Sequence, residues 1–458
     1  MELKLAAPLS FALVAGLALP VASGAMASAA ANRTTTLTVA YWPETDPPGT
    51  NATPNWLKVA AGQMQRLHPG VTVSLDPITT DSESEYYAKL DLAERSSRTT
   101  PDVVYEDSFL IGSDASAGYI RPLPALKSWS GWSKYYSPMQ GIATYQGQIY
   151  GAMNSTDVQL IYYDANLFRK AGLPVPWQPR NWADVLHAAK ELKAKDAGIT
   201  PVWVYTGQAL GEASSFRGFE IFLNGTNDRL FDNATNRWEV SGPGLSATWQ
   251  FLANLRPYEE PESDWSSPNA AEVVDLQLMP AQQVGIVFDG SWVSDLFVKG
   301  SSKPWPGFFS DYREAQLPTE TGQAPGFTNQ SGGWALCVAE QSKNAALATE
   351  FIETASSAGD LATYDATAGN LPPRSDESSQ PAWLYATTIN PVLKFAADQI
   401  PYSSYRPGLP DYVQISNDIA VLTGEVSSGQ VIAPDAAKTY ESQVTAIVGA
   451  RSSEHMAH

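Results

Sequence analysis

Residues 148–168, QIYGAMNSTDVQLIYYDANLF, decide the organisation that we expect for this chain. Two apolar runs with the composition of β-strands, 149–153 and 158–163, flank a polar patch at 154–157. The patch has no glycine or proline that would turn the chain back. We therefore expect one extended segment that crosses from one compact body to another. Because pockets favour domain interfaces, the polar patch marks the expected cleft for a small molecule.

Length and charge limit the classes of protein that the chain fits. With 458 residues it is too long for one hydrophobic core, so we expect two or three domains. A hydrophobic fraction of 43% and a charged fraction of 17% are typical of a globular protein. The formal charge of −19 repels polyanions, which argues against nucleic acid as a partner.

The residues that most metal sites and nucleophilic active sites need are scarce. Cys337 is the single cysteine, so no intrachain disulfide and no cysteine metal cluster is expected. Two of the four histidines fall in the polar tail at 451–458. We therefore predict no metal, no cofactor and no Ser-His-Asp catalysis.

Residues 1–30 have the pattern of a signal peptide. Lys4 gives a short positive region, 8–21 is apolar, and small residues at 25–29 suit cleavage. The apolar run is shorter than the roughly 20 residues that span a membrane. No cysteine that could take a lipid follows the run, so we expect release into a periplasm.

The first part of the mature chain alternates between strand and helix patterns. We predict strands at 37–42, 71–75 and 101–105 and helices at 55–67 and 83–98. This order favours a parallel sheet with right-handed crossovers.

Ligands of such sheets lie beyond the carboxyl ends of the strands. Here these ends carry Trp42 and Glu44 after the first strand, and Glu106 and Asp107 after the third. The alternative reading of the two adjacent acids is that they cap the next helix.

The alternation starts again after the crossing, so a second α/β body begins near Asp157. Polar, Pro- and Gly-rich segments near 299–326 and 369–374 suit further crossings. We expect a first lobe at 31–154 plus 326–369, a second lobe at 155–310 plus 375–450, and hinge crossings at 311–325 and 370–374.

Several stretches resemble one family in their order along the chain. They are MQRLHPGVTV (64–73), TPDVV (100–104), ASAGYIRPL (115–123), LIYYDANLFRKAG (160–172), NWAD (181–184), VFDGSW (287–292), QSKNAALATEFI (341–352) and NLPPR (370–374). This series resembles the solute-binding proteins of carbohydrate ATP-binding-cassette importers, in the group that includes maltodextrin-binding protein. The resemblance implies two α/β lobes, each a mostly parallel sheet flanked by helices, that close on a sugar.

The resemblance also places the sugar-binding residues. A sugar offers apolar C–H faces and a ring of hydroxyls, which aromatic rings and two-pronged polar groups match. The implied set is Trp42, Glu44, Glu106, Asp107, Asp157, Trp292, Trp334, Tyr405 and Arg406.

The expected function is capture of a sugar by lobe closure and its delivery, by a monomer, to the membrane permease of an importer. An alternative is a secreted glycoside hydrolase that uses paired carboxylates. Glu106 and Asp107 suit that role poorly, because neighbours on an extended chain point to opposite sides. A surface adhesin or lectin without a transporter is a third reading, and the identity of the sugar stays open.

Overall fold

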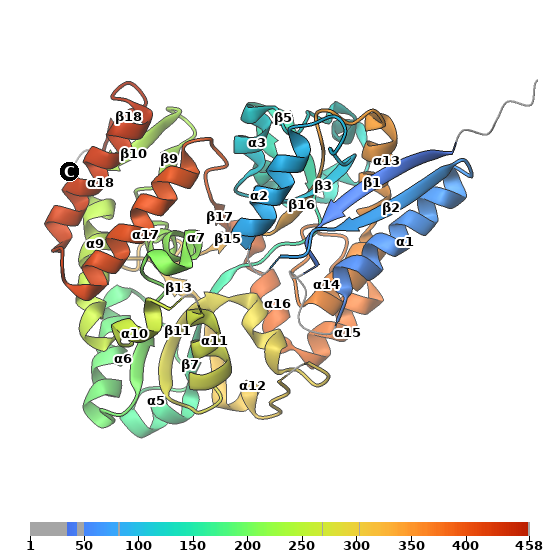
Figure 1. Ribbon diagram of the computed structural model, residues 1–458. Helices are drawn as coiled ribbons and strands as arrows, with labels where there is room; N and C mark the ends of the chain where they lie inside the picture. Colours follow the sequence, from blue (N-terminus) through green and yellow to red (C-terminus); the bar gives the residue numbers. More distant parts are fainter. Residues whose placement is uncertain (1–33, 44–49, 81–82, 268, 302, 457–458) are drawn as a thin grey trace, which may run out of the picture.

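The computed structural model describes residues 34–43, 50–80, 83–267, 269–301 and 303–456. They form two lobes, each built on its own β-sheet with helices packed around it (Figure 1). The two-lobed α/β architecture expected from the sequence is confirmed. The predicted signal peptide at 1–30 lies outside the described residues.

The sheet of the first lobe has the strand order β2-β1-β3-β16-β6. Its strands are β1 (Thr35–Tyr41), β2 (Val71–Pro77), β3 (Val103–Asp107), β6 (Gly151–Met153) and β16 (Trp334–Val338). β1 pairs in parallel with β2 and β3, as the β-α-β-α-β pattern predicts. β16 runs antiparallel to β3 and β6, because the chain reaches it on its return from the second lobe.

Helices cover this first sheet. The helices of this lobe include α1 (Ala52–Leu67), α2 (Glu83–Glu94), α13 (Ala345–Ala355) and α14 (Ala358–Ala368). α1 buries Trp56, Leu57, Ala60 and Met64, which recur at the spacing of one helix face. This face packs against α13 and α14, so segments nearly 300 residues apart close one core.

The sheet of the second lobe has the strand order β12-β7-β11-β8. Its strands are β7 (Gln159–Asp164), β8 (Thr200–Trp203), β11 (Val284–Gly290) and β12 (Tyr312–Ala315). Only β8 and β11 are parallel, so the expectation of a mostly parallel second sheet is wrong. β7 follows directly after the crossing from the first lobe, and it runs antiparallel to β11.

Four larger helices of the second lobe are α6 (Trp182–Lys195), α9 (Pro243–Leu255), α17 (Tyr412–Ser428) and α18 (Ala433–Val448). A shorter one, α5 (Ala165–Ala171), begins directly after β7. The Asp164 carboxylate accepts hydrogen bonds from the N–H groups of Asn166 and Leu167 (2.8 and 2.9 Å) and so caps this helix.

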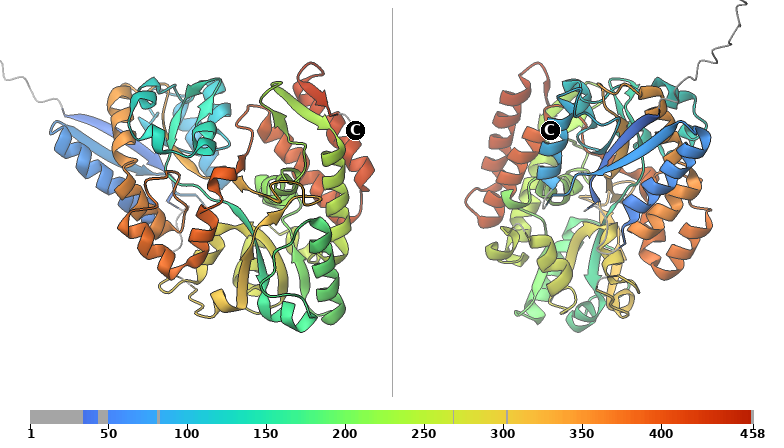
Figure 2. Two further views of the ribbon diagram at one scale, coloured as in Figure 1. Left: turned by 180° about the vertical axis from the view of Figure 1, so that it is seen from behind. Right: turned by 45° about the vertical axis from the view of Figure 1, so that its right-hand side comes forward.

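Three segments connect the lobes, and two of them differ from their predicted positions. Residues 154–158 join β6 to β7 as expected, and this teal segment runs between the lobes in Figures 1 and 2. The other two contain β15 (Gln330–Ser331) and β17 (Ser404–Tyr405), which pair in parallel.

The predicted crossings at 311–325 and 370–374 need correction. Residues 312–315 form β12 at the edge of the second sheet. Arg374 bridges to Tyr135 of the first lobe, and Leu371 bridges to Thr156 of the first crossing, so 370–374 runs from that crossing back along the first lobe. α15 (Pro381–Ile389) packs on α14 of the first lobe, which moves the last crossing to β17. Proline and glycine mark where helices and strands end, but they do not show which lobe the next helix or strand joins.

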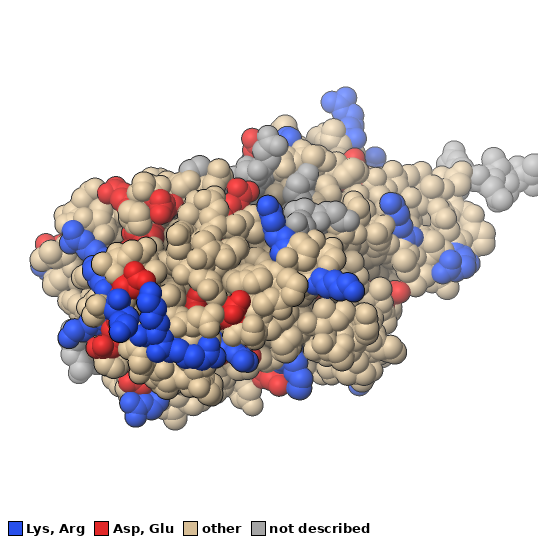
Figure 3. Space-filling view, turned by 90° about the horizontal axis from the view of Figure 1, so that it is seen from below, with Lys and Arg blue, Asp and Glu red and all other residues tan. Residues whose placement is uncertain are grey.

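The outer surface shows no single acidic patch on the face in Figure 3. Lys and Arg side chains lie on this face together with Asp and Glu, although the whole chain carries a charge of −19. Within the described ranges, we find no helix whose length and apolar character would let it cross a membrane.

Candidate functional site

Arg406 connects the two lobes. It follows β17 in the last crossing, and 7% of its surface is exposed. On the first lobe, Nη2 donates to Asp107 Oδ1 and to Ser108 Oγ, each at 2.8 Å. On the second lobe, Nη1 donates to Glu212 Oε1 at 3.0 Å. One buried guanidinium therefore holds a carboxylate from each lobe.

On the second lobe, Glu212 also belongs to a buried hydrogen-bond network that includes Tyr412 of α17. The Tyr412 hydroxyl lies 3.0 Å from Glu212 Oε1 and 2.7 Å from Glu220 Oε1. Gln330 Nε2 donates to Glu220 Oε2 at 2.7 Å. Burial raises the pKa of Glu220 to about 8. This carboxyl group is therefore largely protonated at neutral pH and adds little charge to the site.

Asp157 lies in the crossing between β6 and β7, close to Arg406. Its Oδ1 accepts hydrogen bonds from the Gly332 N–H (3.2 Å) and from Gln159 Nε2 (3.4 Å). Burial raises the pKa of Asp157 to about 6; the nearby Arg406 opposes this shift and Asp107 adds to it. The group is thus ionised at neutral pH but is poised to titrate just below it.

A second arginine cluster lies at the end of β11. Arg217 Nη1 donates to Asp289 Oδ1 at 3.0 Å, and the Tyr205 hydroxyl donates to Asp289 Oδ2. The Arg217 guanidinium lies over the ring of Tyr205 (4.1 Å to the centroid) and near that of Trp292 (5.4 Å). The half-buried Trp292 therefore packs next to the guanidinium of Arg217, which is itself paired with Asp289.

Aromatic side chains line the carboxyl end of the first sheet. We call Trp42, Tyr86, Tyr87, Tyr105 and Trp334 the aromatic wall. Trp334 stacks on Tyr105 with ring centroids 4.7 Å apart and an angle of 8° between the planes. Trp42 stacks on Tyr86 and contacts Trp334, with centroids 5.7 and 5.8 Å apart. Both tryptophans are half-buried.

The structure brings most of the predicted site residues to the junction of the lobes. Asp107, Asp157 and Arg406 form the charged cluster, Trp42 and Trp334 belong to the aromatic wall, and Trp292 lies beside Arg217. Their role in binding a ligand stays a prediction.

Two of the three remaining predicted residues are placed differently. Glu106 is completely buried, and the acids that act on it are Glu94 and Asp114; burial, first of all, raises its pKa well above the usual range. It lies on the other face of β3 from Asp107, because side chains alternate along a strand. Tyr405 packs over Gly141 of the first lobe. Glu44 lies outside the described residues.

The sequence did not single out Arg217, Glu212, Gln159 or Asp289 as site residues, although all four join the cluster. Asp289 belongs to the VFDGSW stretch, so its place near the end of a buried strand is a usable signal. Arg217 and Glu212 stand in a helical region with no local pattern that indicates their partners.

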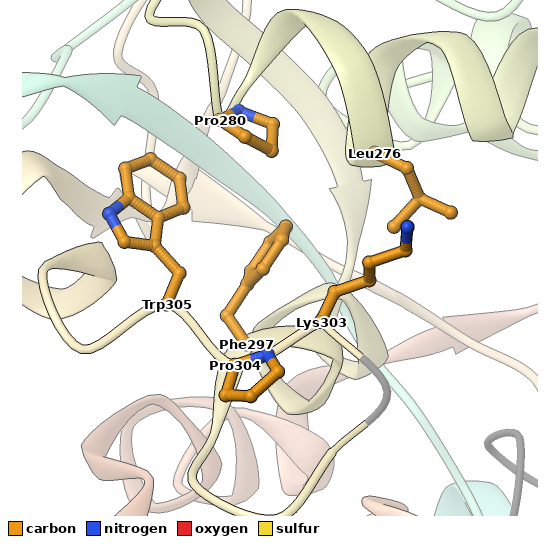
Figure 4. Close-up of a pocket in the computed structure, with 6 residues that line it drawn as sticks. All are labelled: Leu276, Pro280, Phe297, Lys303, Pro304 and Trp305. Carbon is orange, nitrogen blue, oxygen red and sulfur yellow. The ribbon is translucent and has the colours of Figure 1, made fainter.

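A shallow hollow in the second lobe is separate from this cluster. Figure 4 shows its lining by Leu276, Pro280, Phe297, Lys303, Pro304 and Trp305. These side chains are mostly apolar, and Lys303 is the one charged group among them. The hollow therefore lacks the paired polar groups of the lobe junction.

The chain matches a known protein family and has relatives of known name. The family "Bacterial extracellular solute-binding protein" matches residues 48–362. The sn-glycerol-3-phosphate-binding periplasmic protein UgpB of Rhizobium meliloti is 27% identical over 31% of this chain and 34% of its own length. The match thus spans about a third of that curated relative. The mannitol-binding protein of Pseudomonas aeruginosa is 24% identical over 69% of this chain and 74% of its own.

Solved structures share the fold. A solute-binding protein of an ABC transporter from Thermotoga lettingae, bound with α-D-tagatose, superposes with a TM-score of 0.70. It is 21% identical, and the superposition covers 91% of this chain and 100% of that one.

Proposed function

Since this chain belongs to the family of bacterial extracellular solute-binding proteins, we propose that it captures a small carbohydrate in the cleft between its lobes. The observation that carries the proposal is the junction at Arg406. There, one guanidinium holds Asp107 of the first lobe and Glu212 of the second. The strand partner of Asp107 is Trp334, whose half-buried ring contacts that of Trp42. The hydroxyl groups of a sugar can hydrogen-bond to such paired polar groups, and its C–H faces can pack on the aromatic rings.

Capture works by closure of the lobes around the three crossings. The first lobe supplies Asp107 and the aromatic wall, and the second supplies Glu212 and Trp292. A ligand that contacts both sets favours the closed state over the open state by the free energy of the added contacts. The names of the relatives support this ligand class, because mannitol and tagatose are both polyhydroxylated.

Delivery to the permease of an ATP-binding-cassette importer completes the proposed role. The closed pair of lobes offers the permease a surface that the open protein does not have. We propose that the protein is exported by the segment at 1–30, acts in the periplasm as a monomer, and carries out no reaction on its ligand.

The glycoside hydrolase alternative has little support from the geometry. Such enzymes place two carboxyl groups about 5 to 9.5 Å apart on either side of one bond. Glu106 is buried with Glu94 and Asp114, whereas Asp107 pairs with Arg406 at the cleft. The family and the similar proteins are also binding proteins.

A thermal-shift screen with monosaccharides, disaccharides and mannitol tests the proposal, with chromatography of each sugar afterwards. A raised Tm with unchanged sugar is the expected result. Release of smaller sugars would point to the hydrolase instead. If no sugar or polyol raises Tm, and titration calorimetry also finds no binding, the proposed function is wrong.

A further inference from the structure

Both arginines at the lobe junction are already paired with carboxylates. Arg406 is bound by Asp107 and Glu212, and Arg217 by Asp289. Arg217 is further covered by the rings of Tyr205 and Trp292. A phosphate group needs arginine or lysine donors that can turn toward it. Here the guanidinium groups would have to give up buried ion pairs to bind one.

The acids of the junction outnumber its bases. The carboxyl groups of Asp107, Asp157, Glu212 and Asp289 face the two arginines. Glu220 lies near Arg406 and Asp275 near Arg217, but burial raises the pKa of both groups and so favours their neutral forms. The groups that act on Asp157 are Arg406, Arg217 and Asp107, and Arg406 already carries two other carboxylates. The junction therefore has excess negative charge in a place that water screens weakly.

A buried acceptor atom next to Asp157 has no hydrogen-bond partner among the residues that the structure describes. Gln159 is 1% exposed, and its Oε1 has no hydrogen-bond partner in the described part of the chain. The Gln159 amide donates to Asp157 Oδ1, so the two side chains lie together. Asp157 accepts its hydrogen bonds at Oδ1, and Oδ2 takes part in neither. A ligand group that donates hydrogen bonds fits this corner, and one that only accepts them does not.

From this charge balance we infer that the cleft selects its ligand by charge. It binds amino sugars more tightly than the neutral sugars of the same shape, and it rejects their phosphates. This inference rests on the proposed function, because it specifies the ligand of the same site. It also separates the chain from its relative that is named for binding sn-glycerol 3-phosphate.

The aromatic wall strengthens the same preference. A cation near the face of a tryptophan or tyrosine ring is attracted by the negative face of the ring. Trp42 and Trp334 are half-buried and lie at the carboxyl end of the first sheet, where Asp107 also lies. A phosphate dianion gains nothing from these rings, and the excess negative charge of the junction repels it.

Isothermal titration with matched ligands tests the inference at pH 7.5 and low salt. One set is glucosamine, glucose and glucose 6-phosphate; a second is mannitol and mannitol 1-phosphate, with sn-glycerol 3-phosphate measured alone. We expect glucosamine to bind more tightly than glucose, and each phosphate to bind at least about tenfold more weakly than its neutral parent. A phosphate that binds as tightly as its parent, or glucosamine that binds more weakly than glucose, would overturn the inference. Absence of binding by every sugar and polyol would instead overturn the proposed function beneath it.

One variant and its control test whether Asp157 causes the preference for an amino sugar over a neutral sugar. D157N should lose the preference for glucosamine over glucose while it still binds glucose. The control D435N removes an exposed carboxylate on α18 and should keep the preference of the unmodified protein. If D157N keeps the full preference, Asp157 is not the residue that selects charge. Circular dichroism melts check that both variants are folded.

Discussion

Asp107 at the end of β3 and Arg406 in the last crossing form an ion pair, with 2.8 Å between Oδ1 and Nη2. The exposed fractions of the two residues are 6% and 7%, so the pair is almost completely removed from water. The same guanidinium binds Glu212, which is 194 residues away in sequence. Arg406 is thus a shared counter-charge for acids of both lobes.

Replacing Arg406 by leucine should destabilise the protein strongly. The change leaves Asp107 buried without its positive partner, which typically costs about 3–5 kcal/mol in the free energy of unfolding. Urea denaturation followed by tryptophan fluorescence measures the loss. The control R180L breaks an ion pair whose arginine side chain is 83% exposed, and we expect a change below about 1 kcal/mol. Equal midpoints for R406L and R180L would contradict a structural role for the buried pair.

Replacing Trp292 by alanine should remove sugar binding with a modest effect on folding. The side chain is half-buried and lies beside Arg217, so its loss removes a ring surface from the cleft and little from the core. W249A is the contrasting variant, because Trp249 is completely buried in the second lobe. We expect W249A to lower the free energy of unfolding by about 3–5 kcal/mol. A sugar-induced Tm shift that survives in W292A would place Trp292 outside the site.

The sequence predicts local structure better than it predicts long-range partners. The alternation of strands and helices in the first lobe and the crossing at 154–157 follow from composition and spacing within short windows. The pairing of Arg406 with Glu212 joins two segments that neither pattern relates, and the helical region around Arg217 gives no indication that Asp289 is its partner. The predicted crossing at 311–325 failed for a similar reason, since pairing with β7 decides that 312–315 is a strand.

Replacing Gly333 by alanine should disturb the place where two crossings touch. Gly333 has φ +117°, and a Cβ atom there would lie 2.3 Å from the Ser155 carbonyl oxygen. We expect a loss of about 1–3 kcal/mol from the backbone conformation, and a further loss from the clash. Gly118 is the matched control, because its φ is +75° and a Cβ there meets nothing within 4 Å. If G333A and G118A have the same urea midpoint, the close approach of the crossings is unimportant for stability.

The titration of Asp157 should appear in both stability and binding. Its pKa is raised to about 6 in the folded protein, above the ordinary value of 3.8, so the folded state binds the proton more tightly than the unfolded state does. The stabilisation from this proton is therefore complete below about pH 4 and is lost as pH rises through 6. A shift of this size corresponds to at most about 3 kcal/mol, at about 1.4 kcal/mol for each pKa unit.

D157N removes this titration. Its free energy of unfolding, compared with that of the unmodified protein, should therefore rise between pH 4.5 and pH 7.5. Ligand affinity should follow the opposite trend in the unmodified protein, because the ionised carboxylate is the better acceptor for a hydroxyl or ammonium group. We expect sugar binding to weaken between pH 7 and pH 5, and this dependence to flatten in D157N. Parallel pH profiles of the two proteins, in stability and in Kd, would show that Asp157 does not titrate in this range. The opposite signs of the two profiles arise from one cause: the cleft keeps Asp157 ionised at a cost to folding, and a hydrogen-bond donor on the ligand offsets that cost.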